Sequence, residues 1–304
     1  MNTNLTTKGK RNRTEFIGKA ITFLCIALIV VIVCSIFFFI ANYGLTSFIS
    51  PQSASKPEGV NFFNFLFSST WNPANYQFGA LPMFLGSIGV TLIAALFATP
   101  FAIAAAIFMV EIAPKAGSKI LQPVIELLVG IPSVVYGFIG ASILVPFMRG
   151  IFGGSGQSIL AGAVVLFVMI LPTVTTMSID SLKAVPRNYR EASLALGATR
   201  WQTIWKVVLR ASTSGIMTAV VFGMARAFGE ALAVQMVIGN MPAMPQGLTT
   251  PASTLTSILT MGISNQVPGT VQYNILWSLA LLLLFMALVF NIIIRLIGRK
   301  GAMK

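Results

Sequence analysis

Six long apolar runs dominate the sequence and limit what the chain can fold into. They cover approximately residues 21–41, 82–111, 122–148, 158–180, 212–240 and 274–297. A helix needs about 20 apolar residues to cross the hydrocarbon core of a bilayer, and each run is long enough. Because that core holds no water for backbone groups, such runs fold as helices with internal hydrogen bonds. We therefore predict an all-α integral membrane protein with six transmembrane helices in a lipid bilayer.

The composition supports this class and argues against several chemistries. Of the 304 residues, 56% are hydrophobic and only 9% are charged, whereas soluble domains carry about one quarter charged residues. The chain has no histidine, which removes the usual zinc ligands and the Ser-His and Cys-His catalytic pairs. It also has no G-x-x-x-x-G-K-[ST] loop for binding ATP phosphates. We expect no enzymatic activity, no metal and no cofactor in this chain.

The positions of the basic residues predict the topology. Short cytoplasmic loops carry an excess of Lys and Arg. If both termini are cytoplasmic, 17 of the 20 basic residues lie inside and two, Lys56 and Arg149, lie outside. The remaining one, Arg226, falls within the fifth run. The net charge of +13 therefore indicates membrane orientation, and no nucleic-acid partner is expected.

This topology divides the chain into five parts. The first run is too long for the h-region of a cleaved signal peptide, about 7 to 15 residues, so we interpret it as a retained helix. The aromatic segment 61–71 that follows is typical of a short interfacial element. The predicted parts are a cytoplasmic basic tail (1–20), a first transmembrane helix (21–44), an extracytoplasmic loop (45–80), a core of five helices (81–297) that includes a cytoplasmic loop (181–211), and a cytoplasmic tail (298–304).

Two opposite charges lie inside the fifth run. Arg226 and Glu230 are four residues apart, so a continuous helix over 212–240 would place them on one face. A charge at the bilayer centre costs about 2.5 to 3.5 kcal/mol, so both are expected to face the bundle interior or an aqueous path. The pair could be a salt bridge that holds helices together. Alternatively, Arg226 offers planar donors to an oxyanion such as phosphate, with Glu230 as its resting partner. Three further acids are expected near the inner interface in solvated or capping roles: Glu111, Glu126 and Asp180.

Three prolines are expected to break the apolar runs, at Pro100, Pro132 and Pro172, with an ordinary kink in a packed bundle as the alternative for each. Ser133 and Thr173 directly follow two of them. Because a proline frees backbone groups, a neighbouring hydroxyl could meet an oxyanion, and both residues are candidates for the substrate path. The alternative is that each hydroxyl bonds its own helix backbone.

The cytoplasmic loop itself has helical patterns. Residues 189–196 are good helix formers, Gly197 offers a break, and "TRWQTIWKVVL" follows with apolar residues at helical spacing. Those residues are Trp201, Ile204, Trp205 and Val208. We predict two short amphipathic helices joined at Gly197, which either lie on the membrane surface or dock onto a partner protein.

The stretch "EASLALGATRWQTIWKVVL" resembles the EAA loop of ABC-importer permeases. That pattern is Glu-Ala-Ala, three residues, Gly, nine residues, an aliphatic residue, one residue, Leu, then Pro. The matching positions are Glu191, Ala192, Ser193, Gly197, Val207 and Leu209. The chain departs from the pattern with Ser193, with Val207 in place of isoleucine, and with Arg210 in place of proline. The resemblance implies the type I importer permease fold and a coupling helix that docks in a groove on a separate ATPase.

Two further stretches, "ELLVGIPSVVYG" and "ARAFGEALAVQMVIGN", resemble the PstC-type permease of the high-affinity phosphate importer. The sister permease, of PstA type, carries a similar charged motif, so that alternative stays open. A permease for sulfate or molybdate is another alternative, and a secondary transporter or channel is a remote one.

The resemblance also implies the surroundings of the chain. It implies a PstA-like second permease, a PstB-like ATPase dimer, a PstS-like extracytoplasmic phosphate-binding protein and inorganic phosphate as the cargo. The location it implies is the cytoplasmic membrane of a bacterium or archaeon.

Overall fold

The computed structural model describes residues 5–49 and 61–302. Within them, six helical segments are long and apolar enough to cross a membrane, which confirms the predicted number. These segments are Glu15–Phe48, Leu81–Ile112, Ser133–Phe152, Ile159–Lys183, Arg200–Phe228 and Val271–Ile297. The all-α membrane class predicted from the sequence is therefore confirmed.

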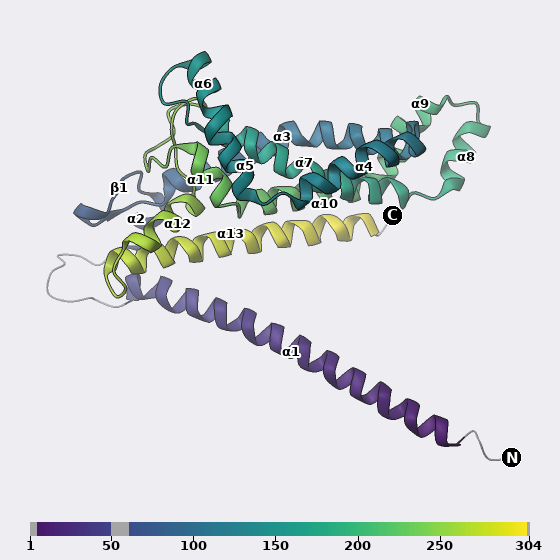
Figure 1. The fold of residues 1–304 in the computed structure, drawn as a ribbon, viewed down its shortest axis with the longest axis horizontal. Coiled ribbons are helices and arrows are strands. Elements are labelled where there is room, and N and C mark those ends of the chain that lie inside the picture. The colour runs from purple at the N-terminus through teal and green to yellow at the C-terminus, as the bar shows by residue number, and fades with distance from the viewer. Residues whose placement is uncertain (1–4, 50–60, 303–304) are drawn as a thin grey trace.

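The first helix, α1 (Leu5–Ile49), diverges from the other helices along most of its length (Figure 1). None of its most apolar window is buried within the chain. It meets α13 (Val271–Ala302) near its end, where the Ser278 hydroxyl donates to the carbonyl of Gly44 at 2.7 Å. The start of α1 and the end of α13 both lie toward the side that carries α8 and α9 (Figure 1).

A short aromatic helix and a hairpin follow α1. Helix α2 (Phe62–Phe67) is the element predicted over 61–71. Strand β1 (Trp71–Asn72) pairs antiparallel with β2 (Gln77–Phe78) across the turn η1 (Pro73–Asn75). These elements lie at the opposite end of the bundle from α8 and α9 (Figure 1).

Three helices form the centre of the bundle: α3 (Leu81–Ile107), α7 (Ile159–Lys183) and α10 (Leu209–Phe228). Small residues let them approach closely. A Cβ at Gly223 of α10 would lie 2.6 Å from Cγ2 of Val174 on α7. Pro100 lies inside α3 and Pro172 inside α7, so neither breaks its helix, which rules out the predicted break and leaves the alternative at both positions. Neighbouring helices support the freed backbone groups at such positions.

The third run breaks at Pro132, as predicted, and the membrane span that follows, Ser133–Phe152, differs from the predicted bounds of 122–148. After α3 and the π-helical turn η2 (Phe108–Ile112), α4 (Pro114–Gly130) ends and Ile131 adopts an extended backbone. Proline disfavours the helical conformation of the residue before it, which explains this end. The chain then continues as α5 (Ser133–Ile139), the π-helical η3 (Gly140–Leu144) and α6 (Val145–Phe152).

The fifth run also differs from the prediction of a continuous helix over 212–240. Helix α10 ends at Phe228 with Gly229 as its cap, and α11 (Leu232–Ile238) begins after a short non-helical segment. Glycine has a low helix propensity, which favours an end of the helix here. Glu230 lies outside any helix, and its carbonyl accepts a hydrogen bond from the Thr256 hydroxyl at 2.9 Å. Helix α12 (Leu255–Asn265) supplies that threonine.

Candidate functional site

Arg226 lies near the end of α10 and donates from Nη1 to the Thr173 hydroxyl of α7. Thr173 directly follows Pro172, and the structure therefore brings together two of the predicted substrate-path residues. The Arg226 side chain is exposed, and it forms no ion pair with a carboxylate of the described residues. A cation in a membrane-spanning helix thus has a neutral hydroxyl as its hydrogen-bond partner within this chain.

Glu230 does not pair with Arg226, so the predicted i, i+4 ion pair is absent. The helix break at Gly229 separates the two residues. Oε1 of Glu230 instead accepts a hydrogen bond from the backbone N–H of Ala233 at 3.4 Å, at the start of α11. The first N–H groups of a helix have no partner within the helix, and a carboxylate there satisfies one of them.

The hydroxyl of Thr173 behaves differently from those of its neighbours. Thr175 and Thr176 each donate to a carbonyl of their own helix, at 2.7 and 2.9 Å. Such bonds are the usual arrangement for hydroxyls in membrane helices. Thr173 has no bond of this kind within α7 and accepts from Arg226 instead. The Thr173 hydroxyl therefore faces the Arg226 guanidinium between α7 and α10.

Ser133 and Tyr136 lie at the other helix break. Ser133 is the first residue of α5 and is half-buried, and its hydroxyl makes no hydrogen bond to a described residue. The Tyr136 hydroxyl donates to the carbonyl of Leu128 at 2.8 Å, which holds the end of α4 across the break. Tyr136 also lies within electrostatic range of Arg226. We did not predict Tyr136, although its position four residues after Pro132 could have indicated it.

The two broken spans pack against each other through glycines of the third run. A Cβ at Gly137 would lie 2.9 Å from Cα of Ala233 on α11, and one at Gly140 would lie 2.8 Å from Cγ1 of Val237 on the same helix. Any side chain at these positions would push α5 and η3 away from α11. Tyr136 on α5 and Thr173 on α7 thus belong to helices that both pack against α11.

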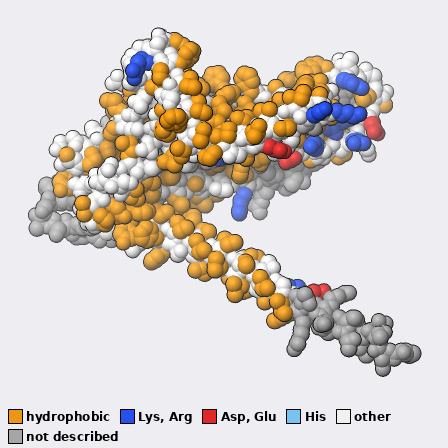
Figure 2. All heavy atoms as spheres, viewed as in Figure 1, with side chains coloured by type: hydrophobic (Ala, Val, Ile, Leu, Met, Phe, Trp, Pro, Cys, Tyr) orange, Lys and Arg blue, Asp and Glu red, His pale blue; other side chains and the backbone are white. Residues whose placement is uncertain are grey.

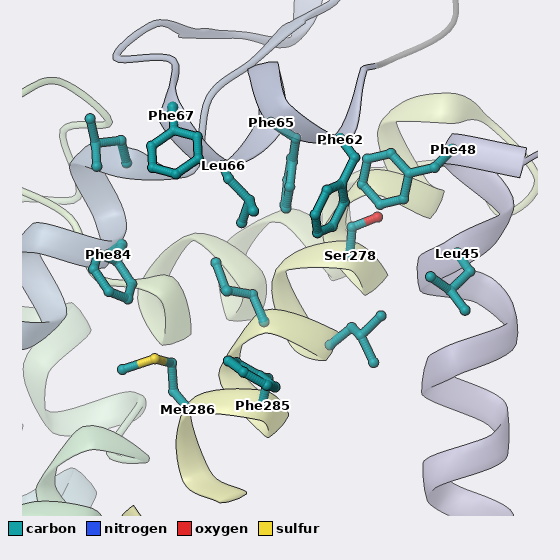
Figure 3. A pocket seen from close by; sticks show the side chains of 13 residues that line it. Leu45, Phe48, Phe62, Phe65, Leu66, Phe67, Phe84, Ser278, Phe285 and Met286 are labelled. Carbon is teal, nitrogen blue, oxygen red and sulfur yellow. The ribbon is translucent and has the colours of Figure 1, made fainter. Parts of the chain in front are cut away.

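A cavity of about 670 Å³ lies elsewhere, between α1, α2, α3 and α13. Phenylalanine rings line much of it, including Phe48 and Phe62, which meet edge to face (Figure 3). Ser278 is the single polar residue of the lining, and its hydroxyl already donates to Gly44. A cavity without charged side chains or free donors cannot recognise an oxyanion, because a desolvated anion needs them.

The predicted coupling loop has its joint at Gly197, as expected, but only the first half is a separate short helix, because α9 continues through η4 (Ile204–Val208) into α10. Helix α8 (Arg187–Ala195) ends before Gly197, whose φ of +83° is a left-handed conformation that favours glycine. Thr199 then caps α9 (Arg200–Thr203) in a capping box with Gln202. The hydroxyls of Ser193 and Thr203 lie 2.9 Å apart and join the two helices.

The second half of the loop presents aromatic residues outward. Trp201 and Trp205 stack with centroids 6.0 Å apart, and each is 59% exposed. Ile204 and Val208 are buried on the opposite side of the π-helical turn η4 (Ile204–Val208). Lys and Arg side chains gather at the same end of the molecule (Figure 2). Exposed aromatic residues with basic neighbours are typical of a docking surface.

The remaining residues of the EAA pattern divide by burial. Glu191 and Ala192 are exposed on α8, whereas Val207 is partly buried and Leu209 packs against the buried cluster that contains Val208. The pattern thus combines residues that face outward with residues that anchor the loop.

Comparisons with known proteins extend these observations. Residues 98–301 match the family described as "Binding-protein-dependent transport system inner membrane component". The probable ABC transporter permease protein YqgH of Bacillus subtilis is 48% identical over 299 residues, covering 97% of this chain and 94% of the relative. The phosphate transport system permease protein PstC of Mesorhizobium japonicum is 33% identical over 265 residues, covering 79% and 81%. The predicted resemblance to PstC-type permeases is confirmed.

Solved structures agree on the fold. A chain of a bacterial alginate ABC transporter, solved with an alginate-bound periplasmic protein, aligns with a TM-score of 0.65 at 14% identity, covering 96% of each chain. A chain of the methionine ABC transporter MetNI in an inward-facing conformation aligns with a TM-score of 0.57 at 19% identity, covering 75% of this chain and 99% of that one. At such identities the likeness shows the fold alone, that of an ABC importer permease. The chain belongs to the binding-protein-dependent transport system inner membrane component family, as a multi-pass permease of the bacterial inner membrane.

Proposed function

We propose that this chain is the PstC-type permease subunit of an ATP-driven phosphate importer and forms half of the translocation path. A PstA-like permease would supply the other half. The similarity to PstC relatives over most of the chain supports this proposal. The observation that carries it is the state of Arg226, an exposed guanidinium in a membrane-spanning segment whose hydrogen-bond partner is a hydroxyl.

The geometry around Arg226 suits an oxyanion. A guanidinium presents its donors in a planar fork that matches phosphate, and Thr173 engages one of its nitrogens. With no carboxylate paired to it, Arg226 keeps its positive charge available to an arriving anion. The half-buried hydroxyl of Ser133, at the neighbouring helix break, would add a further donor along the path. Glu230 would hold the start of α11 rather than compete with the anion.

The power for transport would come from a separate ATPase. The EAA loop over 181–211 would dock on a PstB-like ATPase dimer through the exposed residues of α8 and α9. A PstS-like protein would deliver phosphate from the other side of the membrane. Both termini and this loop would then be cytoplasmic, and the segment 45–80 would be extracytoplasmic. Closure of the ATPase dimer would rock the bundle between its open states.

Uptake of phosphate into proteoliposomes tests this function. The four kinds of subunit are reconstituted with ATP inside, and radiolabelled phosphate is followed with sulfate or molybdate as competitors. We expect ATP-dependent phosphate uptake that excess sulfate and molybdate do not reduce. Uptake of sulfate or molybdate instead would favour a permease for another oxyanion.

The Arg226→Gln variant tests the role of the charge. Arg149→Gln is the matched control, since that arginine donates to the Ser155 carbonyl in the connection after α6. We expect Arg226→Gln to lower uptake by about 100-fold, in line with the loss of a hydrogen bond to a charged group, and Arg149→Gln to leave it near wild type. Wild-type uptake by an assembled Arg226→Gln complex would rule out a direct role.

A further inference from the structure

Arg190, on the coupling helix α8, binds two separate elements of the bundle and the connection between α7 and α8. Its Nε and Nη2 donate to Oε1 of Glu111 at 3.0 and 2.6 Å. Its Nη1 donates to the Val185 carbonyl at 2.6 Å, and Nη2 also donates to the Leu182 carbonyl at 3.0 Å. Glu111 belongs to η2, the continuation of α3, and Leu182 lies in the last turn of α7. All three nitrogens of the guanidinium are therefore in use.

The rest of α8 has little attachment to the bundle. No residue of α8 is buried, and its other side-chain hydrogen bond to a different element joins Ser193 to Thr203 of α9. The side chains of Arg190 and Glu111 are only 20% and 12% exposed. In the described part of the chain, Arg190 is thus the side chain that fastens α8 to α3 and α7. The solvated or capping role expected for Glu111 is corrected by this pairing.

The residue types suit a rigid link. Arginine holds a carboxylate and neighbouring carbonyls in one fixed plane, whereas lysine is a flexible point charge. The last carbonyls of a helix lack partners within the helix, and a cation there is favourable. Removing one member of a partly buried pair leaves the other charge uncompensated, so the link resists separation.

We propose that Arg190 is a positioning residue that makes α8 move as one body with the ends of α3 and α7. A displacement of α8 then reaches α3 through Glu111 and α7 through the Leu182 carbonyl, as well as α10 along the chain through α9. The proposal rests on the proposed function in one respect, that a separate ATPase docks on the loop containing α8.

The coupling between hydrolysis and transport provides the first test. In the reconstituted complex, Arg190→Met is expected to lower the phosphate transported per ATP hydrolysed by about tenfold, within the range by which positioning residues change coupling. Glu111→Gln keeps an acceptor oxygen and should give a smaller loss. Lys119→Met on α4 is the control, since it removes the same charge from an exposed side chain that lies outside α8. A wild-type ratio in assembled Arg190→Met, or an equal loss in Lys119→Met, overturns the proposal.

A distance measurement tests the link without any substrate. Spin labels are placed at Asn188→Cys on α8 and Phe97→Cys on α3, both exposed positions, with Cys25 and Cys34 changed to serine. Adding ATP should leave the distance between the two labels unchanged in the complex that retains Arg190. In the Arg190→Met complex, ATP should shift or broaden the distribution of that distance. An unchanged distance in the variant overturns the proposal. If Arg190→Met fails to assemble, Glu111→Gln is measured in the same way.

The two tests separate this inference from the proposed function. If the unmodified complex binds the ATPase but takes up no phosphate, the assignment of the cargo fails and the distance measurement still decides the role of Arg190. If the unmodified chain binds no ATPase, the proposed function itself fails.

Discussion

The two helix breaks beside Arg226 are built in different ways. The break between α4 and α5 is local, because Pro132 ends the helix and Tyr136, four residues later, closes the gap by donating to Leu128. The break between α10 and α11 depends on a distant residue, because Thr256 of α12 donates to the carbonyl of Glu230. Local sequence therefore determines the first break, whereas a tertiary contact also holds the second.

This difference has a consequence for the anion site proposed at Arg226. Arg226 comes directly before the tertiary break, and Ser133 directly after the local one. A site between two breaks stays open only if both are held and if α5 remains against α11. Substitutions can separate these contributions, beginning with the packing that both breaks share.

The largest effect is expected for Gly137→Leu. Its side chain would meet Cα of Ala233 and Sδ of Met236, where even a Cβ would lie within 2.9 and 2.8 Å. Overpacking costs about 1 to 3 kcal/mol and more where backbone must move. We expect the variant to lose most of its folded, monodisperse protein in detergent, measured by size-exclusion chromatography and thermal melting. Gly150→Leu in α6 should behave like wild type, because a Cβ there meets nothing within 4 Å.

The tertiary break should respond next, to Thr256→Val. This change keeps the shape but leaves the Glu230 carbonyl without its donor, at a position where Thr256 is 3% exposed. An unpaired buried acceptor costs about 1 to 3 kcal/mol, so the apparent melting temperature should fall. Thr260→Val is the control, since that hydroxyl donates within its own helix. Equal melting temperatures for the two variants would show that Thr256 does not hold the break.

The local break should respond less, to Tyr136→Phe. The change removes the hydrogen bond to Leu128 but leaves Pro132, which by itself prevents a continuous helix. We expect a loss of about 0.5 to 1.5 kcal/mol, the usual net value of one hydrogen bond. Thermal melting of Tyr136→Phe beside Thr256→Val compares the two breaks directly. A larger loss for Tyr136→Phe would reverse the order proposed here.

The same difference explains which features the sequence could predict. The apolar runs and basic loops were sufficient to predict six membrane-spanning helices, and Gly197 was sufficient to predict the joint between α8 and α9. The break at Pro132 was also expected from its residue type. Pro100 and Pro172, however, lie inside helices that continue through them, so the same residue type has a different outcome there. A local pattern predicts structure where local chemistry decides it.

The site was predicted only in part for the same reason. Arg226 and Thr173 were both candidates, but their contact joins residues 53 apart in the sequence, and no spacing rule indicates it. The pair of Arg226 and Glu230 was expected from helical spacing. That spacing assumed a continuous helix, whereas α10 ends at Phe228. The link of Arg190 to Glu111 joins residues 79 apart in the sequence, and it could not be predicted from the sequence either. Contacts between helices that are distant in the sequence can be identified only once the fold is known.

The smallest effect is expected for Glu230→Gln. Because Glu230 is not paired with Arg226, the change removes a charge but keeps an oxygen that can accept from Ala233 at the start of α11. The loss should be about 0.3 to 1 kcal/mol, the contribution of a charge near a helix N-terminus, and phosphate uptake should change less than about twofold. Uptake in proteoliposomes beside Arg226→Gln measures this. If the two variants were equally impaired, and exchanging the two charges restored transport, Arg226 and Glu230 would act as a pair during transport, and the tertiary break would have to close in the transport cycle.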